Sequence, residues 1–173
     1  ATTCRRTPRS AELRARPVRI ALIAVGDKPP SWVREGYADY AKRLPHPHAP
    51  ALVEIPPGAR SATRDPARAI AEEGARVIAA LPKNAYVVAL DERGAAWSTT
   101  ELAKKTEAWE QSGRDVALLI GGADGHAPEV MARADAKWSL SPLVLPHMLV
   151  RLVVIEQLYR AWSIRKGHPY HRA

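Results

Sequence analysis

Residues 138–172 read WSLSPLVLPHMLVRLVVIEQLYRAWSIRKGHPYHR, and the rest of the chain is organised around this stretch. It begins as a short apolar segment at Trp138 and passes through Ser141, Pro142 and Pro146. A long run of apolar residues then predicts a helix. The stretch ends in a cationic tail that carries histidine and tyrosine. Apolar packing and positive charge therefore meet at the C-terminal end.

The length and the charge of the chain limit the classes of protein to which it can belong. A chain of 173 residues is long enough for one well-buried domain, and two independent cores are not expected at this length. The formal charge of +8 gathers at the two ends: residues 1–17 hold five arginines against one glutamate, and residues 147–173 hold five cations against one glutamate. Such basic ends attract polyanions such as nucleic acid, and a merely solvated basic surface is the alternative.

Residues 1–17 are interpreted as a disordered basic arm that precedes a single domain at 18–173. The arm resembles the remnant of an organellar transit peptide, although a plain disordered arm explains its composition equally well. The lone Cys4 favours a reducing compartment. We expect a cytoplasmic location in a bacterium, or a chloroplast or mitochondrion if the arm is a transit-peptide remnant. Charges interrupt the apolar run at 146–164, which predicts no membrane partner.

Apolar periodicity predicts an alternation of strands and helices. Strands are expected at 18–25, 51–55, 86–90, 115–120 and 137–140. Helices are expected at 31–44, 66–81, 99–113 and 128–134, and from 146 toward the tail. This order predicts an α/β fold with a mainly parallel sheet and helices on both of its faces.

Polar residues at the ends of these segments predict local structure. Ser31, Asp65 and Ser98 are each expected to cap a helix, the last in a capping box with Glu101. Asp91 and Glu92 are expected in a loop that follows the strand at 86–90. Glu72 and Arg76, one helical turn apart, are expected to form an exposed ion pair.

Three glycines form the clearest candidate for a ligand site. Gly121, Gly122 and Gly125 follow a buried strand, where missing side chains let a ligand approach the backbone. Their spacing is not the dinucleotide-binding pattern, and a tight turn is the alternative. The histidine pairs of the chain lack further ligands beside them, so no metal site is predicted.

The final helix and its tail carry charges that need an explanation. Arg151 falls on the apolar helix face of Ile155 and Leu158, so its guanidinium needs a partner. That partner is either an acid across a packed interface or an anionic substrate. The cations and Tyr170 at residues 165–172 suit single-stranded RNA, and a solvated chain end is the alternative.

The segments LLIGGADG, WSLSPLVLPHMLVRLVVIEQLYRAWSI and HPYHR together resemble one family. They are similar to the bacterial and organellar methyltransferases H of the SPOUT superfamily, which act on N3 of a pseudouridine in large-subunit (23S-type) ribosomal RNA. The resemblance spans residues 18–172 and includes IAVGDKPPSWVREGYADY and VVALDERG. It implies a C-terminal trefoil knot, S-adenosylmethionine as cofactor and a homodimer. It also implies action on assembled ribosomes, at the stem-loop that bridges the subunits.

The resemblance assigns roles to individual positions. Its cofactor contacts correspond to Leu90, Gly121, Gly122, Leu140, Ser141, Pro142, Leu143, Val144 and Leu145. Pro142 departs from the family pattern and lacks a backbone donor. The candidates for catalysis are His147, Arg151, Tyr170, His171 and Arg172, and those for substrate binding are Arg165, Lys166 and His168.

Two other functions fit the same residues. A non-catalytic RNA- or ribosome-binding module would use the glycines and the tail for structure and affinity only. Methylation of a different RNA by the same fold is the second alternative.

Overall fold

One parallel sheet forms the centre of the molecule. The computed structural model describes residues 16–61, 63 and 65–172. Within these ranges five strands pair in the order β2-β1-β4-β3-β5, and every pairing is parallel. The strands are β1 (Ile20–Val25), β2 (Ala51–Ile55), β3 (Tyr86–Ala96), β4 (Val116–Ile120) and β5 (Ala136–Ser139). The predicted parallel sheet is confirmed.

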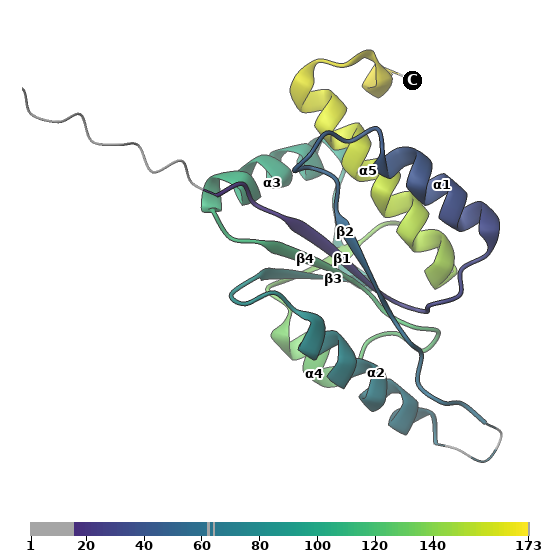
Figure 1. The fold of residues 1–173 in the computed structure, drawn as a ribbon. Coiled ribbons are helices and arrows are strands. Elements are labelled where there is room, and N and C mark those ends of the chain that lie inside the picture. Colours follow the sequence, from purple (N-terminus) through teal and green to yellow (C-terminus); the bar gives the residue numbers. More distant parts are fainter. Residues whose placement is uncertain (1–15, 62, 64, 173) are drawn as a thin grey trace, which may run out of the picture.

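Helices cover both faces of this sheet, as predicted (Figure 1). One face carries α1 (Ser31–Ala41), α3 (Thr99–Ser112) and α5 (His147–Lys166). The opposite face carries α2 (Pro66–Ala80) and α4 (Pro128–Arg133). A short 3-10 turn, η1 (Pro169–Arg172), follows α5.

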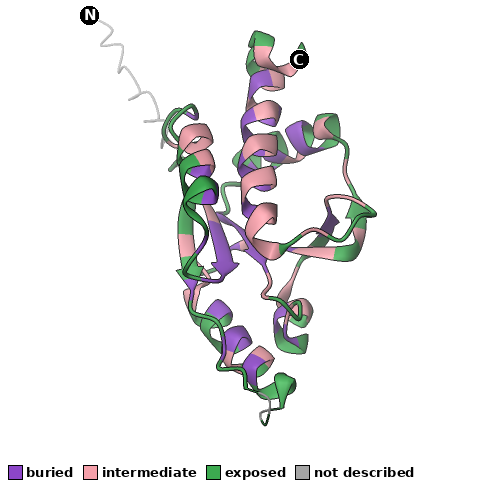
Figure 2. Cartoon of the chain, turned by 90° about the vertical axis from the view of Figure 1, so that its right-hand side faces the viewer, coloured by how far each residue is buried: buried purple, intermediate pink, exposed green. Residues whose placement is uncertain are grey.

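The core explains why β4 is the central strand. All five of its residues are buried, and the purple strands inside the molecule in Figure 2 show the same enclosure. Alternate side chains point to opposite faces of a strand. Leu118 packs with the cluster under α1, α3 and α5, whereas Leu119 packs with the cluster under α2 and α4. A strand buried on both faces must be apolar throughout, which is how VALLI reads.

Two of the three predicted helix caps are present. Asp65 accepts a hydrogen bond of 3.0 Å from the amide of Ala67. Ser98 and Glu101 form the expected capping box, with distances of 2.7 and 3.2 Å. The prediction for Ser31 was wrong, because Pro30 occupies the N-cap position and no side chain caps α1.

The course of β3 beyond Leu90 differs from the prediction. Asp91 and Glu92 belong to the strand, which continues to Ala96. The register against β5 shifts between Leu90 and Ala95, so a second stretch of β3 pairs with Trp138 and Ser139. These backbone pairings hold polar residues in a strand that the sequence alone reads as a loop.

The predicted pair of Glu72 with Arg76 was wrong in its partners. Glu72 forms an ion pair of 3.4 Å with Arg68, one turn earlier. Arg76 instead donates to the carbonyls of Pro56 and Pro57, at 2.8 and 3.3 Å. The side chain of Arg76 thus ties α2 to the segment that follows β2.

Ion pairs connect the residues that precede β1 and β4. Asp115 accepts hydrogen bonds from the Arg16 side chain at 2.7 Å and from the Arg19 amide at 3.0 Å. Burial works to raise the pKa of Asp115, but these hydrogen bonds outweigh it and hold the pKa below its usual value. The rest of the expected basic arm, residues 1–15 with Cys4, lies outside the described residues.

No helix among the described residues is long and apolar enough to cross a membrane. The division into a basic arm and a single domain stays a prediction, as does the trefoil knot.

Candidate active site

A cavity of about 450 Å³ lies at the C-terminal ends of β4 and β5, beside residues 90–93 in the middle of β3. Open parallel sheets commonly bind ligands at this edge. The cavity is lined by residues from three segments, 90–93 in β3, 120–126 after β4, and 138–150 around the loop between β5 and α5. Three parts of the chain that are far apart in sequence therefore build one site.

The cavity brings together nearly all the residues expected to contact a cofactor. Eight of the nine line it, namely Leu90, Gly121, Gly122, Leu140, Ser141, Leu143, Val144 and Leu145. Pro142 is exposed and does not line the cavity. Their roles in binding remain predictions, but their convergence on one cavity is a property of the fold.

The glycine loop, residues 121–125, is packed too closely to admit side chains at two positions. A Cβ atom on Gly121 would lie 2.8 Å from the backbone carbon of Gly125. A Cβ atom on Gly122 would lie 2.9 Å from the Oε2 atom of Glu73. The amide of Gly125 donates to the carbonyl of Gly122 at 3.1 Å, which closes the turn. The tight turn is therefore confirmed, and the same turn lines the cavity. The approach of a ligand to its backbone stays a prediction.

The loop between β5 and α5 forms another part of the cavity wall. Ser139 donates to the Ser141 carbonyl at 3.2 Å, and the Leu143 amide donates to the Ser141 hydroxyl at 2.9 Å. This local bonding turns two apolar side chains outward, so that Leu143 is 72% and Val144 is 82% exposed. Large apolar side chains exposed at the edge of a cavity are available to cover an apolar part of a ligand.

The cavity is acidic although the chain is strongly basic. Among its lining residues, three carboxylates (Asp91, Glu92 and Asp124) face one guanidinium (Arg93), which leaves a formal charge of −2. A hydrogen bond from Arg93 holds the pKa of Asp91 below its usual value. Burial lowers the pKa of His126 and of His147, so both lining imidazoles are neutral at pH 7.

His147 and Arg151 stand one turn apart at the start of α5, yet only His147 lines the cavity. Arg151 is 1% exposed, and it donates to Glu54 at 2.6 Å and to the Gly26 carbonyl at 3.0 Å. Of the two partners that the sequence left open for this guanidinium, the structure supplies the acid. A role for Arg151 toward substrate stays a prediction.

The remaining catalytic and substrate candidates gather at the other end of α5. A helix of 20 residues is about 30 Å long, so this end is remote from the cavity in the same protomer. The Arg165 guanidinium makes two bonds to Glu110, at 2.8 and 2.5 Å. Lys166, His168 and Arg172 are exposed, and His171 contacts the His168 carbonyl.

Tyr170 is held against the body of the molecule. Its hydroxyl lies 3.1 Å from the Tyr40 hydroxyl and 3.1 Å from the Glu156 carboxylate. Arg160 bonds to the same carboxylate at 2.9 Å and stacks on the Tyr170 ring. Burial, followed by the hydrogen bond to Tyr40, raises the pKa of Tyr170. This hydroxyl is therefore protonated at neutral pH.

Several lining residues were not among the predicted site residues, namely Asp91, Glu92, Arg93, Asp124 and His126. One signal could have found them, because Asp91, Glu92 and Arg93 directly follow the apolar run of β3, and Asp124 and His126 lie in the loop after β4. Residues at the carboxyl ends of parallel strands share one edge of the sheet. Within the described ranges, no cluster of three or more His, Cys, Asp or Glu side chains could hold a metal ion.

Comparison with known proteins agrees with this architecture. Residues 18–171 match the family model described as predicted SPOUT methyltransferase. Proteins named ribosomal RNA large subunit methyltransferase H are 60% identical in Stenotrophomonas maltophilia (strain R551-3) and 56% identical in Xanthomonas oryzae pv. oryzae (strain PXO99A). Each alignment covers 90% of this chain and 100% of the relative.

A solved structure shares the fold at low sequence identity. It belongs to a probable methylase family protein from Haemophilus influenzae Rd KW20, with a TM-score of 0.51 and 14% identity. The alignment covers 88% of this chain and 69% of that one. Sequence, fold and cavity agree, and the chain belongs to the SPOUT methyltransferase family.

Proposed function

We propose that this chain transfers a methyl group from S-adenosylmethionine to N3 of a pseudouridine in large-subunit ribosomal RNA. The observation that carries the proposal is the convergence of eight predicted cofactor positions on one cavity. Relatives that align over their whole length carry names that specify large-subunit ribosomal RNA. The pseudouridine and its N3 atom come from the family resemblance.

The cavity fits this cofactor in size, lining and charge. Its volume of about 450 Å³ lies within the range usual for small-molecule sites. Leu90, Leu143 and Leu145 offer apolar surface to an adenine ring, and the glycine loop lines the same cavity. The formal charge of −2 suits a cationic ligand. When bound, the cofactor supplies a methyl group on a positively charged sulfur.

The residues of the chain have two tasks in the reaction. They must orient the base, and they must accommodate the loss of the N3 proton. The imidazole of His147 lines the cavity and is neutral at pH 7 because burial lowers its pKa, so its free nitrogen can accept a hydrogen bond or a proton. Arg151, one turn further along α5, adds positive charge behind His147. Such charge favours a developing anion.

The tail residues require a second copy of the chain. Arg165, Lys166, His168, Tyr170, His171 and Arg172 are remote from the cavity of their own protomer, so we propose that a homodimer brings them to the cavity of the partner. A cofactor-deficient Gly122→Val chain mixed with a chain lacking residues 167–173 would then regain activity that neither variant has alone. Inactivity of the mixed dimer, with both chains folded and associated, would contradict this arrangement.

Two further parts of the proposal concern the setting of the reaction. The substrate is the assembled ribosome, at the stem-loop that bridges the subunits, and the location is the cytoplasm of a bacterium. The Stenotrophomonas and Xanthomonas relatives are bacterial and give an organellar location no support.

A direct test combines cofactor binding with RNA analysis. The purified chain is titrated with S-adenosylmethionine by calorimetry, and then incubated with ribosomes from a bacterial strain that lacks its own methyltransferase of this kind. Mass spectrometry of the fragmented RNA is expected to find one added methyl group on a pseudouridine of the large subunit. Cofactor binding without this product, but with methylation elsewhere, would favour action of the same fold on a different RNA. No binding at millimolar cofactor would favour the non-catalytic module.

A further inference from the structure

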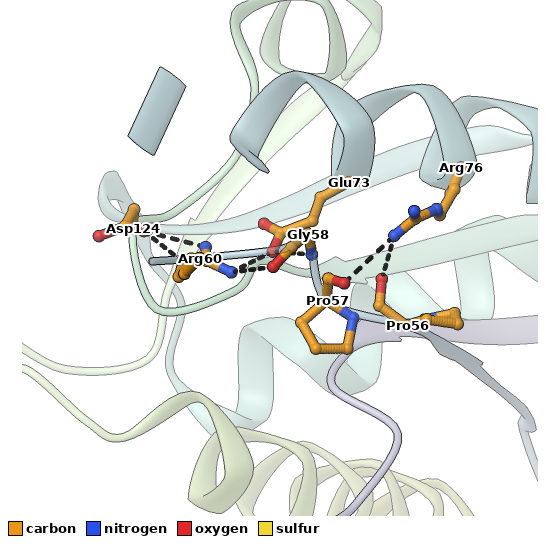
Figure 3. A network of polar contacts seen from close by, with 7 residues as sticks. All are labelled: Pro56, Pro57, Gly58, Arg60, Glu73, Arg76 and Asp124. Carbon is orange, nitrogen blue, oxygen red and sulfur yellow. Dashed lines mark hydrogen bonds and ion pairs between the residues drawn. The ribbon is translucent and has the colours of Figure 1, made fainter. Parts of the chain in front are cut away.

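Arg60, in the segment between β2 and α2, joins two parts of the molecule that are distant in sequence (Figure 3). Its Nη1 atom lies 2.6 Å from Glu73 Oε1 on helix α2. Its Nε and Nη2 atoms donate to Asp124 Oδ2 in the glycine loop, at 3.0 and 2.9 Å. One guanidinium therefore connects a helix on the outer layer to the wall of the cavity.

The carboxylate of Glu73 is held directly behind the glycine loop. Glu73 is 3% exposed, and its Oε1 atom also accepts the amide of Gly58 at 2.8 Å. Its Oε2 atom is buried with no hydrogen-bond partner among the described residues, and it occupies the space that a Cβ atom on Gly122 would approach. A buried carboxylate is costly unless it is paired, and Arg60 supplies the positive charge.

The same stretch of chain also contacts the opposite wall. Glu54, near the end of β2, forms the ion pair with Arg151, one turn beyond His147 in α5. Six residues later, Arg60 holds Asp124. Residues 54–60 thus brace both the α5 side and the glycine-loop side of the cavity, although they do not line it.

We propose that Arg60 is a positioning residue for cofactor binding, which holds the glycine loop in the conformation that completes the cavity. The proposal rests on the proposed function, because the ligand is S-adenosylmethionine. Arg60 acts through Asp124 and has no contact with the reacting atoms. The planar guanidinium can hold Glu73 and Asp124 at the same time, which the point charge of a lysine cannot reproduce.

The test measures cofactor affinity by calorimetry in single variants. Asp124→Asn is the first, because it weakens the bond to the glycine loop and leaves the pair of Arg60 with Glu73 in place. Arg60→Ala and Arg60→Lys follow. We expect Arg60→Ala to weaken the affinity about tenfold, the loss of roughly one charge-assisted pair, with Arg60→Lys recovering only part of it. The KM for the cofactor should rise in the same proportion while kcat changes less.

Arg76→Ala is the matched control. Arg76 lies on the same helix as Glu73 and anchors the same segment through the Pro56 and Pro57 carbonyls, but among the described residues it has no recorded contact with the glycine loop (Figure 3). Its cofactor affinity should equal that of the parent chain. A thermal unfolding curve of each variant identifies any general loss of stability.

Three results would overturn the proposal. If the cofactor affinities of Arg60→Ala and Asp124→Asn stay within about twofold of the parent, the contact between Arg60 and Asp124 does not support cofactor binding. An equal loss in Arg76→Ala would mean that any disturbance of the segment suffices. Full additivity of Arg60→Ala and Asp124→Asn in the double variant would show that the two residues act separately. If neither the parent nor Arg76→Ala binds the cofactor, the proposed function fails instead.

Discussion

The two ends of helix α5 make an instructive comparison. At its first turn, His147 lines a cavity that one protomer builds from three separate segments. At its last turn, Arg165 is paired with Glu110, and the following Tyr170 packs against Tyr40 and Glu156. At the cavity end, lining side chains such as His147 face a space that a ligand can occupy. At the tail end, Arg165 and Tyr170 are already bonded to other side chains of the same chain.

This difference separates two kinds of site residue. Cofactor positions can be complete in a single chain because the strands of one sheet end together. The tail positions lie at the other end of α5, and under the proposed function they would act only when a second chain brings them to its cavity. Binding of the small ligand and recognition of RNA should therefore respond to different substitutions, and variants at the two ends of α5 test that separation.

The largest effect is expected in the glycine loop. Gly121→Ala should weaken cofactor affinity about 100-fold, because a Cβ atom 2.8 Å from the backbone of Gly125 forces the loop to move. Calorimetry measures the affinity. Gly36→Ala is the control, since its Cβ atom meets only the flexible side chain of Leu152, and neither Gly36 nor Leu152 lines the cavity. Unchanged affinity in Gly121→Ala would mean that the loop takes no part in binding.

A smaller effect on stability is expected at the partner of Arg151. Glu54→Ala leaves the buried guanidinium without its acid and should lower the free energy of unfolding by about 2 kcal/mol. Urea denaturation measures the loss. Glu72→Ala removes an exposed ion pair on α2 and should change stability by less than about 0.5 kcal/mol. Equal losses in the two variants would contradict the structural role of Arg151.

At the tail end, Tyr170→Phe should affect stability and leave the cavity intact. Removal of the hydroxyl beside Tyr40 and Glu156 is expected to cost about 1 kcal/mol in the free energy of unfolding. Cofactor affinity should stay that of the parent chain. Lys104→Ala, an exposed change on α3, serves as the stability control. A large loss of cofactor affinity in Tyr170→Phe would show that the tail end of α5 also takes part in cofactor binding.

The smallest effect concerns pH at the cavity end. Burial lowers the pKa of His126 in the folded protein, so the unfolded chain takes up the proton first as the pH falls. Stability should therefore decrease below the ordinary value of about 6.5, until the lowered pKa is passed. His126→Gln should reduce this slope in urea denaturation between pH 7 and pH 5. Identical slopes in the variant and the parent would show that burial of His126 is not the source of the pH dependence.

The sequence predicted the sheet well because several of its strands are short apolar runs that end at glycine or proline, and VALLI before Gly121 is typical of a strand buried on both faces. It did not predict the second part of β3, because DERGAA is polar and joins a strand only through its pairing with β5. The cofactor positions came from the family resemblance. Arg60, Glu73 and Asp124 escaped notice because their contacts span 13 and 64 residues, and no local pattern encodes such a pairing.

The lining of the cavity has a formal charge of −2, whereas the whole chain has a formal charge of +8. This contrast should make the cavity selective for the sign of a ligand's charge. At long range the basic surface draws in any polyanion and speeds its arrival. The lining carboxylates of Asp91, Glu92 and Asp124 outnumber Arg93, so we expect the cavity to disfavour phosphate groups and to accept an uncharged base more readily. Free nucleotides and inorganic phosphate should therefore compete poorly for this space.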